Sequence, residues 1–328
     1  MYKFRNFSFI KKERGEKMKL LTYNFKGKNR VGFLFEESIV DLNQAILTMK
    51  AEQRDKHGIP QYPNMVSFLN AGVEAMELAK EAVQFISSSD LVPDQVMVFH
   101  REDVHLQAPI LKPGKIICVG QNYREHILEM NLEIPKYPVI FSRFNNCIIG
   151  ADDPISLPDV TKELDYEAEF LFIIGKKAKN VSREQALDYV AGYTIGNDVS
   201  ARDLQNRTSQ WTQGKIVDGT FPVGPYLVTK DEVVDIHNLD ISLSINGEQR
   251  QHSNTDNLVF DVEYLIEYLS QFMTLEPGDI ILTGTPGGVG APTQSFLQDG
   301  DVVEVRIEQL GVLTNTVQQV KTPVIEGK

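Results

Sequence analysis

Residues 164–175 read LDYEAEFLFIIG, and residues 192–198 read GYTIGND. The first stretch places two glutamates, Glu167 and Glu169, directly before a purely apolar run. Residues two apart in an extended strand point to the same face, so both carboxylates would share one side of a strand that enters a core. Asp198 closes the second apolar stretch and could supply a third carboxylate. Two acids side by side at a core are costly unless a positive charge lies between them.

Three carboxylates with room left for water suit Mg²⁺ or Mn²⁺, which prefer hard oxygen ligands, and do not suit a Zn²⁺ site of Cys and His. In the ordinary alternative, Glu167 and Glu169 form the solvent face of an edge strand and Asp198 is a turn residue. The acidic pair alone favours this ordinary interpretation. The polar and glycine-rich segments that follow shift the balance towards a metal site.

The composition excludes several classes of protein. The chain has 328 residues, a hydrophobic content of 42% and a formal charge of −12, which is typical of a globular protein with one large or two modest domains. An acidic chain without a basic cluster argues against nucleic acid or an anionic membrane surface as a partner. No apolar run approaches the ~20 residues that span a bilayer. With only two cysteines, Cys118 and Cys147, a reducing cytoplasm is the simple inference.

The N-terminal third predicts a small α+β domain over residues 18–105. Residues 1–17 are basic and aromatic, and we interpret them as an upstream extension before a natural start at Met18. Short strands are expected at 20–25, 30–36 and 38–42, and helices at 42–50 and 66–87. A Pro-containing stretch at 109–115 marks the boundary of this domain.

Residues 106–328 predict a mostly β architecture with few helices, hence an α+β class and not an alternating βαβ fold. Helices are expected at 122–130, at 182–189 with Ser182 as N-cap, and at 258–272. Short strands separated by turn signals are expected at 115–119, 138–142, 166–174, 190–195, 223–228, 240–246, 279–283 and 301–309.

Further polar residues have spacings typical of a site. His126 and Glu129 are three apart on an expected helix, where a carboxylate prepares an imidazole as a general base. Arg202 and Gln205 have the same spacing after the strand that ends at Asp198, and Lys215 follows in a loop. Each feature alone also fits a solvated surface pair or a surface lysine. The glycine-rich turn at 282–290 would bring backbone N–H groups close to an anionic ligand.

Five motifs in this order resemble the fumarylacetoacetate hydrolase family, over about residues 113–322. They are Gly-x-Asn-Tyr-x-x-His-x-x-Glu-Met at 120–130, Asp-Tyr-Glu-x-Glu at 165–169, Asn-Asp-Val-Ser-Ala-Arg-Asp-x-Gln at 197–205, a Lys before Asp-Gly-Thr-x-Pro-x-Gly-Pro at 218–225, and Thr-Gly-Thr-Pro-x-Gly-Val-Gly at 283–290. The branch that the chain resembles contains bacterial acylpyruvate hydrolases and 2-hydroxyhepta-2,4-diene-1,7-dioate isomerases. Residues 18–105 resemble the smaller N-terminal domain of some bacterial members.

The resemblance implies a mixed β-sandwich roll, a homodimer, and Mg²⁺ or Mn²⁺ on Glu167, Glu169 and Asp198. It further implies that His126 activates water on a lid segment shared with Glu129. The remaining implied residues are Lys215 and Gln205, which polarise substrate oxygens, and Arg202, Thr285 and Tyr123, which line the site. Two departures from the family pattern, Gln121-Asn122 and Phe141-Ser142-Arg143, argue against fumarylacetoacetate itself as the substrate. We expect Arg143 to favour a substrate with a second carboxylate.

The expected function is a metal-dependent hydrolase that cleaves a carbon–carbon bond in a small 2-oxo or β-diketo acid, such as an acylpyruvate. The presence of both His126 and Glu129 favours hydrolysis, because water must be activated. A decarboxylase of the oxaloacetate type and an isomerase of hydroxymuconate or hydroxyheptadienedioate compounds are alternatives on the same site. A non-catalytic binding protein is the hypothesis from another class, and it predicts the loss of a metal ligand or of Lys215.

Overall fold

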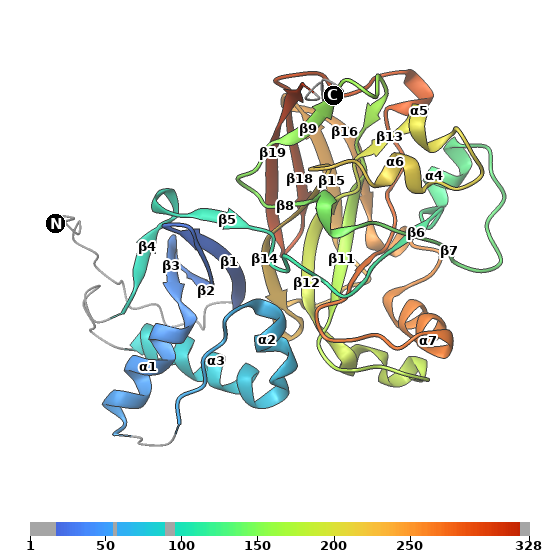
Figure 1. Cartoon of the computed structure of the whole chain (residues 1–328). Helices are drawn as coiled ribbons and strands as arrows, with labels where there is room; N and C mark the ends of the chain where they lie inside the picture. The colour runs from blue at the N-terminus through green and yellow to red at the C-terminus, as the bar shows by residue number, and fades with distance from the viewer. Residues whose placement is uncertain (1–17, 55–57, 89–95, 322–328) are drawn as a thin grey trace, which may run out of the picture.

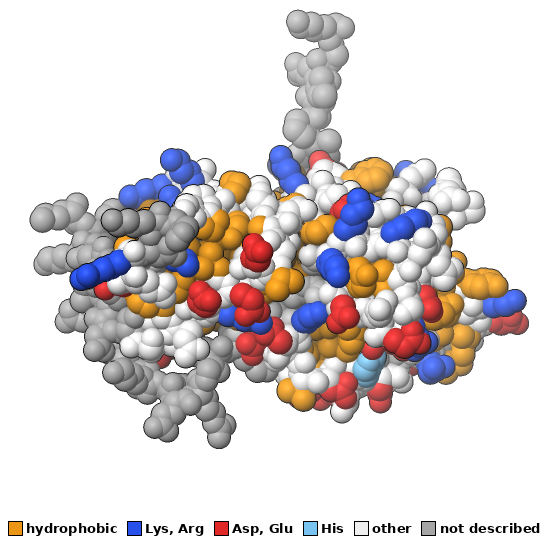
Figure 2. Space-filling view, turned by 90° about the horizontal axis from the view of Figure 1, so that it is seen from below, with side chains coloured by type: hydrophobic (Ala, Val, Ile, Leu, Met, Phe, Trp, Pro, Cys, Tyr) orange, Lys and Arg blue, Asp and Glu red, His pale blue; other side chains and the backbone are white. Residues whose placement is uncertain are grey.

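The computed structural model describes residues 18–54, 58–88 and 96–321. Within these residues the strands form one twelve-stranded sheet, one five-stranded sheet and a short two-stranded pair (Figure 1). The predicted extension at residues 1–17 lies outside the described residues. No helix in the described part is long and apolar enough to cross a membrane. Acidic and basic side chains are intermixed on the face that Figure 2 shows.

The N-terminal part opens with three antiparallel strands and a helix, as the sequence predicts. The side chain of Asp41 caps this helix by accepting a hydrogen bond of 2.9 Å from the N–H of Gln44. These elements are β1 (Lys19–Phe25), β2 (Lys28–Phe35), β3 (Ser38–Asp41) and α1 (Leu42–Glu52).

The single helix predicted over 66–87 is wrong, because the chain breaks there into α2 (Met65–Asn70) and α3 (Gly72–Ser88). Gly72 has a φ of +73°, a left-handed conformation that ends one helix and that glycine adopts without steric cost. The apolar periodicity continues across the break, so the sequence pattern alone does not reveal it.

The N-terminal strands continue into the large sheet of the C-terminal part. Strand β1 pairs antiparallel with β14 (Phe221–Thr229), and β5 (His105–Gln107) pairs with β1. One apolar core lies between helices α1 to α3 and this sheet. The other strands of the sheet are β4 (Val98–His100), β6 (Ile116–Gly120), β7 (Val139–Ser142), β8 (Ile148–Ile149), β11 (Ala168–Ile174), β12 (Val190–Asn197) and β17 (Ile280–Leu282).

The five-stranded sheet packs against the large one, and their facing side chains form a second core. This arrangement confirms the predicted mixed β-sandwich with helices. Three strands of the five-stranded sheet were not predicted from the sequence. The sheet contains β9 (Ile155–Pro158), β15 (Asp240–Ile245), β16 (Glu248–Asn254), β18 (Val302–Ile307) and β19 (Gly311–Val320).

Strand β11 is buried on both faces, which explains its uninterrupted apolar sequence. Phe170 and Phe172 belong to the core between the sheets, whereas Leu171 and Ile173 belong to the core under the helices. The strand predicted at 166–174 is shorter in the structure. Tyr166 and Glu167 separate β11 from β10 (Leu164–Asp165), which pairs with β13 (Ser200–Ala201).

The remaining helices are short apart from α7. The helix predicted at 182–189 is a 3₁₀-helix, and the side chain of Ser182 makes no capping hydrogen bond. The α-helices are α4 (Arg124–Glu129), α5 (Arg202–Gln205), α6 (Thr212–Lys215) and α7 (Val262–Phe272). The 3₁₀-helices are η1 (Arg101–Asp103), η2 (Asn145–Cys147), η3 (Arg183–Tyr189), η4 (Lys230–Glu232), η5 (Thr255–Asn257) and η6 (Ala291–Thr293).

Candidate active site

Three carboxylates meet where β11 begins and β12 ends. Glu167 directly precedes β11, Glu169 is its second residue, and Asp198 directly follows β12. The N–H of Asp198 donates to the carbonyl of Glu167 at 2.9 Å, and the Asn197 side-chain oxygen accepts from the N–H of Glu167 at 2.9 Å. One oxygen from each carboxylate lies within 4.8 Å of the others, and all three residues are buried. The structure therefore places the three predicted ligands together in the interior.

Three buried cations, Lys215, Arg202 and Arg143, contact these carboxylates. Lys215 Nζ lies 2.8 Å from Glu167 Oε2 and 2.6 Å from Asp198 Oδ2. Arg202 Nη2 lies 2.7 Å from Glu167 Oε1, and its Nε donates to Asp165 Oδ2 at 2.8 Å. Burial lowers the pKa of Lys215, but Asp198 and Glu167 outweigh this and raise the pKa overall, so the ammonium stays charged.

The two glutamates differ in their electrostatic surroundings. Burial raises the pKa of Glu167, but Lys215 and Arg202 outweigh it and lower the pKa to about 2. Burial, together with the charges of Asp198 and Glu167, raises the pKa of Glu169 well above its ordinary value. Glu169 Oε2 accepts a hydrogen bond of 2.7 Å from the N–H of Gly284. Glu169 is therefore the carboxylate in this cluster that most lacks a positive partner.

This donor set fits a divalent cation with a preference for oxygen. Each carboxylate offers an oxygen to a common centre, and the repulsion at Glu169 is what a cation would relieve. The wider cluster has one more negative than positive side chain, so a divalent cation would leave it with one positive charge and favour an anionic ligand. Its charged members are Asp165, Glu167, Glu169, Asp198, Arg143, Arg202 and Lys215.

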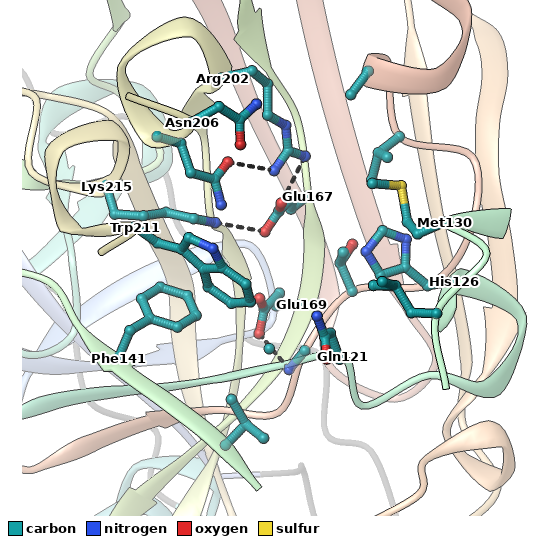
Figure 3. Close-up of a pocket in the computed structure, with 18 residues that line it drawn as sticks. Gln121, His126, Met130, Phe141, Glu167, Glu169, Arg202, Asn206, Trp211 and Lys215 are labelled. Carbon is teal, nitrogen blue, oxygen red and sulfur yellow. Dashed lines mark hydrogen bonds and ion pairs between the residues drawn. The ribbon is translucent and has the colours of Figure 1, made fainter. Parts of the chain in front are cut away.

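A cavity of about 160 Å³ opens onto Glu167 and Glu169. Figure 3 shows the two glutamates at its centre, with Lys215, Trp211 and Phe141 on one side and His126, Met130 and Gln121 on the other. Apolar walls with a few convergent charges are typical of sites for small molecules. The predicted residues that line it are His126, Glu167, Glu169, Arg202, Gln205, Lys215 and Thr285.

His126 and Glu129 lie together on α4, beside this cavity. His126 Nδ1 is 3.5 Å from Glu129 Oε2, which is within ion-pair range but too long for a good hydrogen bond. The Glu129 carboxylate also accepts from the N–H of Gly288, at 3.2 and 3.1 Å. Because Nδ1 is buried against Glu129, Nε2 is the His126 nitrogen available to a substrate.

The structure does not place Arg143 or Tyr123 on the wall of this cavity. The fully buried Arg143 lies behind Asp198, pairs with its carboxylate, and donates to Val199 O at 3.0 Å and to Thr220 Oγ1 at 2.8 Å. Arg143 therefore supports Asp198. This corrects the prediction that Arg143 contacts a carboxylate of the substrate. Tyr123 is buried as well, and its hydroxyl has no hydrogen-bond partner among the described residues.

Sequence reasoning missed several residues of the wall. Phe141 and Trp211 lie edge to face with ring centroids 5.6 Å apart, and the Lys215 ammonium lies 5.1 Å from the centre of the Phe141 ring. Asn206 and Met130 also line the cavity. The one available signal was that the only Trp of the chain lies close to Lys215 in the sequence.

We expect Gly120→Ala to displace Trp211. An added Cβ at Gly120 would come 2.5 Å from the Trp211 ring, which is closer than two non-bonded carbon atoms can approach. Overpacking of this kind costs about 1–3 kcal/mol of stability. Because Trp211 is the only Trp, its intrinsic fluorescence reports the movement directly. Gly58→Ala, which meets nothing within 4 Å, is the control. Identical emission spectra for Gly120→Ala and wild type would contradict the close packing.

Comparison with protein families places this site within a known domain. Residues 115–318 match the family model of the fumarylacetoacetate hydrolase C-terminal domain. This range contains all three carboxylates, Lys215 and the glycine-rich loop that carries Thr285.

Individual relatives are similar over most of their length. The mitochondrial oxaloacetate tautomerase fahd2 of Xenopus laevis is 42% identical over 294 residues, which cover 88% of this chain and 86% of that protein. A fumarylacetoacetate hydrolase structure from Exiguobacterium antarcticum has a TM-score of 0.76 at 35% identity, over 92% of this chain and all of that one. A maleylpyruvate hydrolase from Sphingobium sp. SYK-6, in complex with manganese(II) and pyruvate, has a TM-score of 0.71 at 30% identity, over 92% and 99%.

Proposed function

Because this chain belongs to the fumarylacetoacetate hydrolase family, we propose that it is a divalent-metal-dependent tautomerase. Its substrate would be a small 2-oxo dicarboxylic acid of the oxaloacetate type, interconverted between keto and enol forms. The sequence favoured hydrolysis, with isomerisation and decarboxylation as alternatives. The relative named as an oxaloacetate tautomerase, at 42% identity, moves tautomerisation to the first place.

The observation that carries the proposal is the placement of groups on two sides of one small cavity. Lys215 lies on one side of Glu167 and Glu169, and His126 lies on the other (Figure 3). Keto–enol conversion requires a base at C3 and a proton donor at the C2 oxygen, and little more than this. A cavity of about 160 Å³ suits a substrate of a few carbon atoms.

Two side chains, His126 and Lys215, carry the proton transfers. His126 Nε2 takes a proton from C3, and the electron pair of the broken C–H bond forms the C2–C3 double bond. The π pair of the C2 carbonyl moves to its oxygen, whose developing negative charge the Lys215 ammonium stabilises and then protonates. Exchange with solvent removes the proton from His126 and restores the one on Lys215. A divalent cation on Glu167, Glu169 and Asp198 would supply Lewis-acid stabilisation of the same oxygen. Arg202 and Gln205 offer donors for the substrate carboxylates.

Hydrolysis of an acylpyruvate remains the second candidate. The pairing of His126 with Glu129 supports it, because a carboxylate beside an imidazole prepares it to activate water. Tautomerisation needs the imidazole but no bound water.

A substrate panel tests the proposal. With Mg²⁺, we expect wild-type protein to accelerate the interconversion of enol and keto oxaloacetate, followed by the ultraviolet absorbance of the enol. Pyruvate and CO₂ should form no faster than with Mg²⁺ alone. His126→Ala should slow the conversion about 10²- to 10⁴-fold, which is the usual contribution of a general base. His252→Ala, an exposed histidine on β16, is the control and should be unchanged.

Two outcomes would replace the proposal. Acetylpyruvate split into acetate and pyruvate, with no effect on oxaloacetate tautomers, would establish the hydrolase. Enzyme-dependent release of CO₂ from oxaloacetate that survives His126→Ala would establish a decarboxylase.

The cytoplasmic location and the homodimer stay predictions. The Xenopus relative is named as mitochondrial, which makes the compartment a question for fractionation of the native host. Sedimentation of the purified protein tests the dimer, and a monomer at micromolar concentration would contradict it.

A further inference from the structure

Gln251 is a buried polar residue that the proposed chemistry does not use. It lies on β16 in the five-stranded sheet, where it is 1% exposed between the more exposed Arg250 and His252. Its side chain reaches across to the large sheet at the candidate site. A buried amide of this kind is retained at a cost unless its polar atoms are satisfied.

The amide of Gln251 makes three hydrogen bonds. Its Oε1 accepts from the N–H of Ala168 at 2.9 Å. Its Nε2 donates to Thr285 Oγ1 at 2.9 Å and to the carbonyl of Pro286 at 2.8 Å. An N–H can only donate and a carbonyl can only accept, so these partners fix which end of the amide is oxygen.

This network determines what Thr285 can do. The Thr285 hydroxyl oxygen accepts a hydrogen bond from Gln251, and among the described residues its own proton has no acceptor. Thr285 lines the cavity, so this proton is free for a ligand there. A hydroxyl held in this way has its proton available as a donor to an anionic oxygen.

The other end of the amide connects Thr285 to the metal-binding strand. Ala168 lies between Glu167 and Glu169, so Gln251 spans from the backbone between two of the carboxylates to the hydroxyl on the glycine-rich loop. One buried, hydrogen-bonded side chain from the opposite sheet therefore links the position of the donor to that of the carboxylates.

We propose that Gln251 is a positioning residue that holds the Thr285 hydroxyl as a hydrogen-bond donor to an anionic oxygen of the bound 2-oxo acid. This role rests on the proposed function, and it acts entirely through Thr285. Gln251 itself does not touch the substrate.

A double-mutant cycle tests this role on the full-length protein loaded with Mg²⁺. We expect Thr285→Val to lower kcat/KM for oxaloacetate tautomerisation about 100-fold, as the loss of one preorganised donor does. Gln251→Met should lower it about 10- to 100-fold through misplacement of that donor. The double variant should be no worse than Thr285→Val alone. Gln249→Met, an exposed neighbour on β16, is the matched control and should be unchanged.

Binding provides a readout that does not require turnover. Pyruvate, titrated calorimetrically into each Mg²⁺-loaded variant, should show the same non-additive pattern, whereas Mg²⁺ affinity should change less than about threefold. If Gln251→Met does not fold, Gln251→Glu replaces it in the cycle. Its carboxylate still accepts from the Ala168 N–H but draws the Thr285 proton away from the cavity.

The outcomes separate this inference from the function on which it rests. If the enzyme converts oxaloacetate but the effects of the two single variants multiply in the double variant, the role of Gln251 is overturned and the proposed function is not. A wild type that neither converts oxaloacetate nor binds pyruvate would overturn the proposed function and this role with it.

Discussion

Glu169→Gln will weaken Mg²⁺ and Mn²⁺ binding at least about 100-fold, since even the loss of a residue that only supports a metal ligand costs 10- to 100-fold. The carboxamide keeps the shape of Glu169 and an acceptor for the Gly284 N–H, but it removes one of three negative charges. Tautomerase activity should fall at least as far at limiting metal. Isothermal titration of EDTA-stripped protein with Mn²⁺ measures the affinity, and Glu248→Gln, an exposed acid on β16, is the control.

The same variant should be more stable than wild type when no metal is present. Burial and the neighbouring charges of Asp198 and Glu167 raise the pKa of Glu169 in the folded protein. The folded state then binds a proton that the unfolded state has released, so wild-type stability falls as pH rises from the ordinary carboxyl pKa to the raised one. The Glu169→Gln protein has no carboxyl group to titrate at this position, so it should not lose stability over this pH range. Thermal unfolding in EDTA across that pH range measures it, and equal pH slopes for the two proteins would contradict the account.

Lys215→Met will destabilise the metal-free protein by about 3–5 kcal/mol, the usual cost of removing one member of a buried ion pair. Its ammonium lies 2.8 Å from Glu167 and 2.6 Å from Asp198, and both carboxylates would lose this partner. Because a divalent cation at the same carboxylates supplies positive charge, Mg²⁺ should restore part of this stability. Activity should not return, since the group facing the C2 oxygen is missing.

Urea unfolding with EDTA and with Mg²⁺ distinguishes these contributions. Lys162→Met, an exposed lysine near the same region, should leave both curves unchanged. A Lys215→Met protein that unfolds at the wild-type urea concentration would mean that Lys215 is not the partner of these carboxylates in solution.

The sequence was most informative where local pattern and burial agree. The apolar run after Glu169 lies on a strand that is buried on both faces, so its hydrophobicity is continuous and easily recognised. The three carboxylates follow from it, because strand ends that pair antiparallel bring Glu167 and Asp198 side by side. The motif order then linked them with Lys215 and His126.

Strands whose sequence is polar could not be recognised in this way. Strand β16 reads EQRQHSN and has no apolar residue, and it is a strand because it pairs with β15. Gln251 lies on it, so its hydrogen bonds to Ala168 and Thr285 were beyond sequence reasoning. This strand therefore forms because of its tertiary contacts and not because of its local sequence.

Arg143 shows the same limit for a single side chain. Its place after Phe141 and Ser142 suggested a substrate contact, because arginine favours carboxylates. The chain after β7 instead places it against Asp198, where its Nη1 and Nη2 atoms also donate to Val199 and Thr220. The sequence indicates that an arginine will find a carboxylate, but not whether that carboxylate belongs to the protein or to the ligand.

The most direct test of the central claim is the initial rate at which enol oxaloacetate converts to the keto form with EDTA-stripped wild-type protein, before and after addition of Mg²⁺. We expect a rate equal to the buffer blank without metal, and a rate that rises with protein concentration once Mg²⁺ is present. A protein-dependent rate that is the same with and without Mg²⁺ would contradict that claim.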